Sequence, residues 1–161
     1  MDSKQVFNLK PVLKGWAHDL PFKNSSIDCI VAFHILEHVP NPVDVVLQWL
    51  NMLKPGGGIG IVVPDWRYTW DARNDNNIWS HRWNPTPKLL EKLFNDHWSK
   101  VAWLEHFNTL KWKLSFDVIL IKYGDFVPFR FEDGEKVLTG KELWETGTFC
   151  HLDDDIMTGD R

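Results

Sequence analysis

The sequence predicts an α/β fold in which a mostly parallel sheet closes with an antiparallel hairpin. Residues 27–33 form an almost unbroken apolar run, which is typical of a strand covered on both faces of a parallel sheet, and residues 59–63 form a second such run. A helix between them makes the two strands parallel neighbours. Farther along, two apolar runs, 98–107 and 114–123, flank a short polar segment and predict the hairpin.

The predicted helices carry clear start and stop signals. Asn41 is a good N-cap and Pro42 suits the first helical position, with apolar residues following at helical spacing. The stretch 54–57, Lys-Pro-Gly-Gly, ends this helix. Thr86 and Pro87 start a second helix in the same way, so the order of elements is strand, helix, strand, helix and hairpin.

Composition narrows the class of protein. The chain has 161 residues, enough for one domain, with 43% hydrophobic and 25% charged residues and a net charge of −4. This net negative charge gives no positive electrostatic field that would attract nucleic acid, and no apolar run has membrane-spanning length. Neither nucleic acid nor a membrane is therefore expected as a partner. Cys29 and Cys150 make no disulfide framework, which favours the cytoplasm. The ten tryptophans either pack in the core or form a surface for ligand stacking.

The segment from Asp19 to Asp65 contains, in order, D-L-P-F, S-I-D-C-I-V, H-I-L-E-H-V, L-K-P-G-G and V-P-D. This series resembles the middle of class I S-adenosylmethionine-dependent methyltransferases of the small-molecule type, and the likeness extends over roughly residues 16–124. It implies an incomplete Rossmann-like methyltransferase sheet, with the cofactor S-adenosylmethionine across the carboxyl ends of its strands. The implied reaction is methyl transfer to a hydroxyl of a small molecule or glycan.

The resemblance also implies a domain plan. Residues 1–124 are expected to form a partial methyltransferase domain, from the third to the seventh strand of the family's sheet. Residues 125–161 are an acidic C-terminal extension, with one edge strand at most and otherwise loose.

The resemblance places cofactor contacts in two stretches. Asp19, with Leu20 beside it, ends the third strand, where an acidic residue of the family binds the adenine amino group. Without the resemblance, Asp19 reads equally well as the cap of a turn. Phe33 and His34 end the fourth strand at the edge of the cofactor, and Glu37 follows in the next turn.

Two residues are candidates for the base that removes a hydroxyl proton. Asp65 follows a predicted strand and opens a loop in which Trp66, Tyr68 and Trp70 either stack on a sugar or pack against the domain. His81 lies in a second loop, and histidine titrates near neutral pH. The plainer interpretation of His81 is a polar loop residue bonded to backbone.

A zinc hydrolase is the first competing hypothesis. Residues 34–38, His-Ile-Leu-Glu-His, match the H-x-x-E-H pattern of zinc peptidases. That chemistry needs a long helix carrying both histidines, and Pro40 and Pro42 interrupt any helix here. No metal is therefore expected.

The glycine-rich cofactor loop is the part of the family pattern that we do not find. Residues 1–18 do not supply it, and residues 56–60 match G-x-G-x-G but follow a helix and lead into a strand, which predicts a turn. We therefore expect a truncated domain that binds S-adenosylmethionine poorly by itself, because two or three charge-assisted hydrogen bonds of about 1.5–3 kcal/mol each would be lost.

The truncation would also open one edge of the sheet. Without the family's first two strands, residues 27–33 lie at an apolar edge, which predicts a homodimer or a partner chain there, or pairing with the run 12–17. The alternative function follows: a catalytically inactive methyltransferase-like remnant acting as a binding or assembly module, or one half of a split enzyme.

Overall fold

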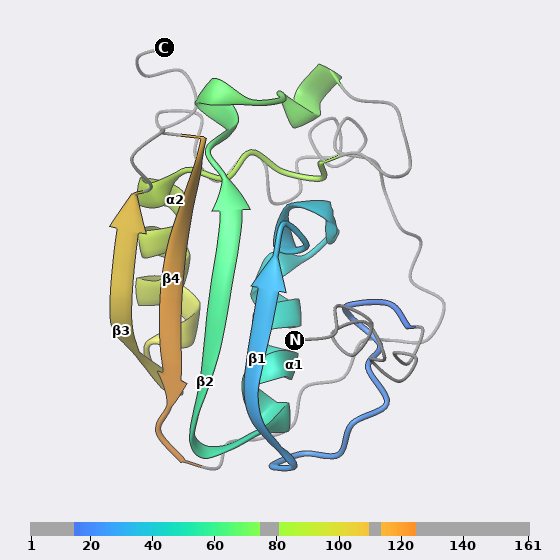
Figure 1. Cartoon of the computed structure of the whole chain (residues 1–161), viewed down its shortest axis with the longest axis vertical. Helices are drawn as coiled ribbons and strands as arrows, with labels where there is room; N and C mark the ends of the chain where they lie inside the picture. The colour runs from blue at the N-terminus through green and yellow to red at the C-terminus, as the bar shows by residue number, and fades with distance from the viewer. Residues whose placement is uncertain (1–14, 75–80, 110–113, 125–161) are drawn as a thin grey trace, which may run out of the picture.

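A computed structural model describes residues 15–74, 81–109 and 114–124 and shows one mixed sheet with helices on one of its faces (Figure 1). The strands are β1 (Ile27–Phe33), β2 (Leu53–Pro64), β3 (Ala102–Thr109) and β4 (Ser115–Lys122). Their order in the sheet is β1-β2-β4-β3. β1 and β2 are parallel, whereas β4 runs antiparallel to both β2 and β3. The predicted α/β fold and its closing hairpin are confirmed.

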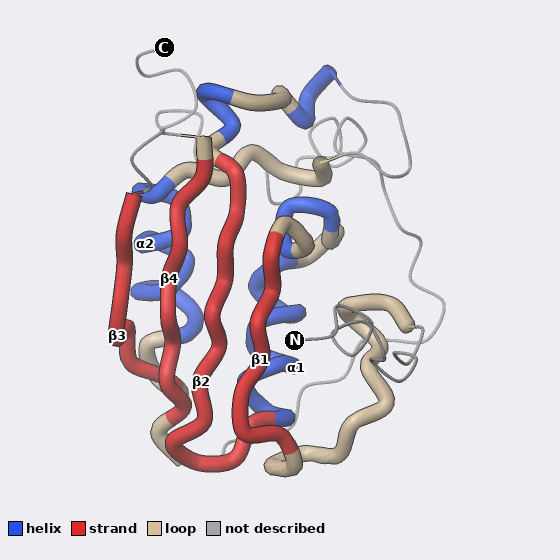
Figure 2. Tube along the Cα trace, in the orientation of Figure 1, coloured by secondary structure: helices blue, strands red, loops and turns tan. Residues whose placement is uncertain are grey.

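Helices α1 (Pro42–Met52) and α2 (Pro87–Leu93) lie behind the sheet in the view of Figure 2. Both predicted caps are present, because the side chain of Asn41 accepts a hydrogen bond from the Asp44 N–H and that of Thr86 accepts one from the Leu89 N–H. A π-helical turn, η4 (Phe94–Trp98), extends α2. The first apolar run of the predicted hairpin, residues 98–107, therefore becomes a strand only at Ala102.

The core fills the space between these helices and the covered face of the sheet. β2 and β4 supply alternate residues to it, as a sheet with one buried face requires. Its fully or almost fully buried members include Val46, Leu50, Ile59, Ile61, Val63, Leu90, Leu93, Phe116, Val118 and Leu120.

The glycine stretch lies inside β2, which begins at Leu53 directly after α1, and not in the predicted turn before the strand. Gly56 has a φ of +77°, a conformation that favours glycine. A Cβ on Gly57 would lie 2.8 Å from the carbonyl oxygen of Asp28 on β1. β2 begins earlier than expected, and a register shift against β1 between Ile27 and Cys29 accommodates the extra residues. The glycines thus serve chain reversal and close strand approach.

The expectation that β1 is covered on both faces is wrong for the described part of the chain. Ala32 is buried, but Val31 is 58% exposed, Phe33 is 64% exposed, and Cys29 is also exposed. No described element lies over this face of the sheet, so the apolar run reflects a strand whose outer face is left open.

β1 is also an edge strand, as predicted. Its outer edge pairs with no other strand among the described residues. Residues 15–20 form a turn closed by a bridge between Trp16 and Asp19, and not the end of a third sheet strand. Residues 12–14 of that predicted strand, and the whole extension 125–161, lie outside the described residues. No helix in the described segments is long and apolar enough to cross a membrane.

Candidate functional site

The chain leaves β1 through a residue in an unusual backbone conformation. His34 has a φ of +50°, in the left-handed region that non-glycine residues rarely enter. Its N–H still donates to the carbonyl of Val62 on β2, at 2.9 Å. The chain then turns into a single 3-10 turn, η1 (Leu36–His38). This turn lies at the carboxyl end of a parallel strand, where open α/β sheets place ligands.

A segment distant in sequence holds η1 in place. The N–H of Arg82 donates to the carbonyl of Glu37 at 2.7 Å, and the indole N–H of the buried Trp83 donates to the carbonyl of Leu36 at 2.8 Å. These bonds bring His81, the residue before Arg82, against η1. Its ring lies edge-on to that of His38, with 5.0 Å between the ring centroids.

Glu37 is the most unusual ionisable group at this end of the sheet. Its side chain is only 1% exposed, and burial raises its pKa to about 7, although a hydrogen bond from its own backbone opposes the rise. Oε1 lies 3.3 Å from Nδ1 of His34 and 3.8 Å from Nε2 of His38. Oε2 is buried and has no hydrogen-bond partner among the described residues.

A pocket of about 550 Å³ opens beside η1, between residues 15–20 and 34–40. Two of the five predicted cofactor residues, Leu20 and His34, line it. The other three lie nearby: Asp19 is exposed and directly precedes Leu20, Phe33 is exposed and directly precedes His34, and Glu37 is buried in η1. The structure thus joins the two predicted stretches in one pocket.

The first predicted base, Asp65, forms a close ion pair. Its carboxylate is 1% exposed and accepts from Nε of Arg67 at 2.9 Å and from Nη2 at 2.5 Å. It also accepts from the Arg67 N–H at 3.2 Å, which closes the short turn after β2. Both carboxylate oxygens therefore have a guanidinium donor.

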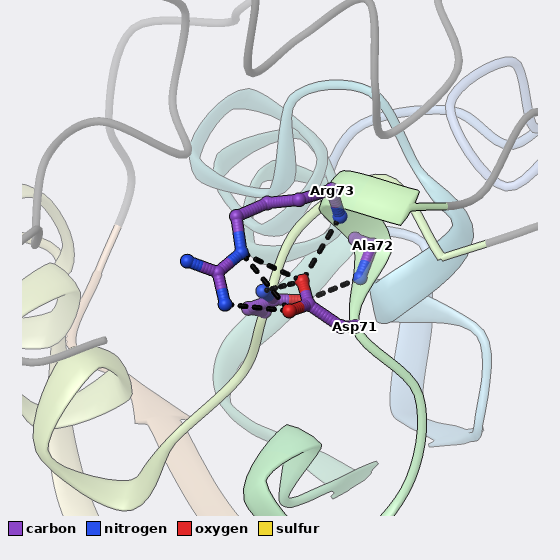
Figure 3. A network of polar contacts seen from close by, with 4 residues as sticks. Asp71, Ala72 and Arg73 are labelled. Atoms are coloured by element: carbon purple, nitrogen blue, oxygen red, sulfur yellow. Dashed lines mark hydrogen bonds and ion pairs between the residues drawn. The ribbon is translucent and has the colours of Figure 1, made fainter. Parts of the chain in front are cut away.

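The same arrangement recurs six residues later (Figure 3). Asp71 accepts from the N–H and Nε of Arg73 at 3.1 and 2.8 Å, and from Nη2 at 2.5 Å. Asn84 donates to Asp71 at 2.8 Å and accepts from the Ala72 N–H at 2.7 Å. Burial alone would raise the pKa of Asp71, but the bonds from Arg73 and Asn84 hold it below its ordinary value. This network fixes the loop after β2 to the segment that holds η1.

Of the three aromatic residues in the loop after β2, one is buried and two are exposed. Trp66 is buried under the guanidinium of Arg73, which lies 5.2 Å from the ring centroid. Tyr68 and Trp70 are exposed, and Trp70 meets the ring of His81 edge-on at 5.4 Å. Only these two rings are placed to stack on a ligand.

Sequence reasoning missed several residues of this site: His38, Arg67, Arg73, Trp83 and Asn84. A signal was present for two of them, because D-x-R occurs twice in the loop after β2 and brackets the aromatic residues. A carboxylate and a guanidinium two residues apart can pair around a tight turn.

Comparisons with known proteins agree with this fold. Residues 2–61 match a family profile described as a methyltransferase domain. A 52-residue stretch is 36% identical to an uncharacterised 37.1 kDa protein in transposon TN4556 of Streptomyces fradiae, and covers 32% of this chain but 15% of that protein.

Three solved structures have the same fold. A chain of the complex between the Haloferax volcanii Trm112 methyltransferase activator and a methyltransferase has a TM-score of 0.55 at 15% identity, over 69% of this chain and 61% of that one. The cyclase SpnF scores 0.52 at 14% identity, over 67% and 54% of the two chains. A SAM-dependent methyltransferase from Aquifex aeolicus scores 0.50 at 13% identity, over 70% and 54%. This chain therefore spans about half to three fifths of their lengths.

These likenesses show a Rossmann-like methyltransferase fold, with a four-stranded sheet that is not closed. The profile matches 60 of the 161 residues, and at 13–15% identity the solved structures show a likeness of fold alone. The cyclase shows that the fold by itself fixes no single reaction, because function resides in the site.

Proposed function

We propose that the pocket beside η1 receives the adenine side of S-adenosylmethionine in a methyltransferase acting on a hydroxyl of a small molecule or glycan. The observation that carries this proposal is the junction of residues 15–20 and 34–40 around one pocket at the carboxyl end of β1. Its volume of about 550 Å³ falls within the range of about 300–1,000 Å³ typical of small-molecule sites.

The side chains present suit a purine ring. Leu20 offers an apolar wall, and the rings of Trp16 and His18, stacked at 6.0 Å, offer flat surfaces. The carboxylate of Asp19 is exposed beside Leu20 and would accept a hydrogen bond from an exocyclic amino group.

Methyl transfer requires few further groups from the protein. S-adenosylmethionine, when bound, supplies an activated methyl group, so the protein has to orient the acceptor and remove its proton. His81 is a candidate base because its imidazole lies beside η1 and Trp70. Asp65 remains the second candidate, and its pairing with Arg67 means that it would have to act while holding that ion pair.

Titration with S-adenosylhomocysteine tests the cofactor pocket. Asp19→Ala should weaken binding about tenfold, the equivalent of one hydrogen bond of about 1.4 kcal/mol. Asp28→Ala is the matched control, because Asp28 is also exposed and pairs with Lys54 at the opposite end of β1. Equal affinity in both variants would argue against adenine recognition by Asp19.

Assays of methyl transfer to glycan and small-metabolite acceptors test the base. His81→Gln and Asp65→Asn each keep the side-chain shape and remove the basic group. Loss of about 10²-fold or more in kcat in one variant would identify the base. Full activity in both would remove both residues from that role.

The exposed edge of β1 favours a second candidate function, assembly with another chain. Val31 and Phe33 are exposed on this edge strand, and unpaired apolar edges invite strand pairing. One structural neighbour occurs in a complex with an activator protein. A homodimer through this edge should appear in sedimentation of the purified chain and dissociate in Val31→Lys. A chain that stays monomeric at every concentration, alone and with candidate partners, would contradict this function.

A further inference from the structure

The geometry points to a binding site for a divalent transition metal ion, zinc or a cation of similar character, formed by Glu37, His38 and His81. This inference does not depend on the proposed methyl transfer. Two of the three residues, Glu37 and His81, were expected from the sequence to contact the cofactor and to remove a proton, and no metal was expected. While His81 binds a cation it could not act as the base, which would leave Asp65 as the candidate.

The three residues offer a coherent ligand set. One ligand atom from each lies within 4.8 Å of the other two. Bonds of about 2.0–2.2 Å to a tetrahedral ion place neighbouring ligands about 3.4 Å apart, so the 3.8 Å between Glu37 Oε1 and His38 Nε2 requires only a small contraction. Two imidazoles and one carboxylate are a common donor set of catalytic zinc and non-haem iron sites.

The buried carboxylate is the independent observation that indicates a ligand. Glu37 is 1% exposed, and its Oε2 has no hydrogen-bond partner in the part of the chain that the structure describes. A buried acceptor without a partner destabilises the fold unless something satisfies it. A cation that both carboxylate oxygens bind, between the two imidazoles, would satisfy Oε2 as well as Oε1.

Hydrogen bonds to the backbone connect the segments that carry the three residues. Glu37 and His81 come from segments 44 residues apart in the chain, joined by the bond from Arg82 N–H to the Glu37 carbonyl at 2.7 Å. The indole of Trp83, bonded to the carbonyl of Leu36 at 2.8 Å, anchors the same contact. Ligands held on a fixed backbone lose little freedom when they bind a metal.

The site also has an open side. The side chain of His38 is 40% exposed and lines the pocket beside η1, together with His34. Three protein ligands leave a coordination position for water or a substrate oxygen. A cation here would face the pocket beside η1.

This site differs from the zinc-peptidase pattern that residues 34–38 resemble. That pattern needs both histidines on one helix, whereas η1 is a single 3-10 turn and the third ligand comes from His81. His34 lies 3.3 Å from Glu37 through Nδ1 and would orient the carboxylate or serve as an added ligand.

Equilibrium dialysis and calorimetry with ZnCl2 alone test the inference, and the visible spectrum of Co2+ reports the coordination. The wild-type chain should bind one ion, and Glu37→Gln, His38→Ala and His81→Ala should each bind it at least tenfold more weakly. His97→Ala, which removes an exposed histidine of η4, is the matched control and should bind as the wild type does.

If His81→Ala fails to fold, His38→Ala still tests the metal site, because His38 is exposed and its loss removes little packing. Absence of zinc binding by the wild type, or equal binding by His38→Ala and the wild type, would overturn the inference. Neither readout requires S-adenosylmethionine, so a failed methyl-transfer assay leaves the result intact.

Discussion

Two loops at the same end of the sheet differ in the partners that they provide for their buried carboxylates. In the loop after β2, Asp65 and Asp71 each pair with an arginine two residues later. In the loop after β1, Glu37 is as buried as Asp65, but its ion-pair partners among the described residues are His34 and His38, and there one of its oxygens has no hydrogen-bond partner. The carboxylates of the first loop are therefore neutralised within the loop, whereas the carboxylate in the second loop is available to bind a ligand.

The largest expected effect comes from removing a guanidinium from the first loop. Arg67→Ala leaves the carboxylate of Asp65 buried without its cation and should lower the free energy of unfolding by about 3 kcal/mol. Urea denaturation measures this. Lys92→Ala, which breaks an exposed pair with Asp96, should cost less than about 1 kcal/mol. Similar values for the two variants would mean that the Asp65 pair is not effectively buried.

The second effect concerns pH. Burial raises the pKa of Glu37 from 4.5 to about 7, so between these values the folded chain keeps a proton that the unfolded chain has released. Stability from this group is therefore complete below about pH 4.5 and is lost as pH rises to about 7. Between pH 4.5 and 8, the wild type should lose about 3 kcal/mol more than Glu37→Gln.

This pH comparison requires urea denaturation in buffers containing a chelator, so that no metal contributes. If the free energy of unfolding depends on pH in the same way in both proteins, Glu37 ionises normally. Its carboxylate would then not differ from those of Asp65 and Asp71 in the way described here.

A smaller effect is expected at the junction of the two loops. Asn84 is buried and bonds both Asp71 and the Ala72 N–H, so Asn84→Ala should destabilise the fold by about 1–2 kcal/mol. Ser99→Ala, which removes an exposed hydroxyl of the turn after η4, is the control and should change stability by less than about 0.5 kcal/mol. Thermal melts of both variants make the comparison.

Local signals in the sequence predict most of the fold correctly. The caps Asn41 and Thr86 locate the helices, because capping depends on side chains a few residues apart. The apolar run of β1 correctly predicts a strand, but one face of this strand is exposed. A run of apolar residues does not indicate which elements will pack against each face.

The site is harder to predict for the same physical reason. Leu20 and His34, which the resemblance assigns to the cofactor, line one pocket, and their cofactor role stays a prediction. The contact between Glu37 and His81 depends on a backbone bond between segments 44 residues apart, and no local pattern encodes it.

NMR titration of the isotopically labelled chain with S-adenosylhomocysteine tests the central claim most directly, because it detects weak binding and locates it. The account predicts that the amide signals that move belong to residues 16–20 and 33–38, at the pocket beside η1. Signals that move only elsewhere, or no movement at millimolar ligand, would contradict the claim that this pocket is the cofactor site.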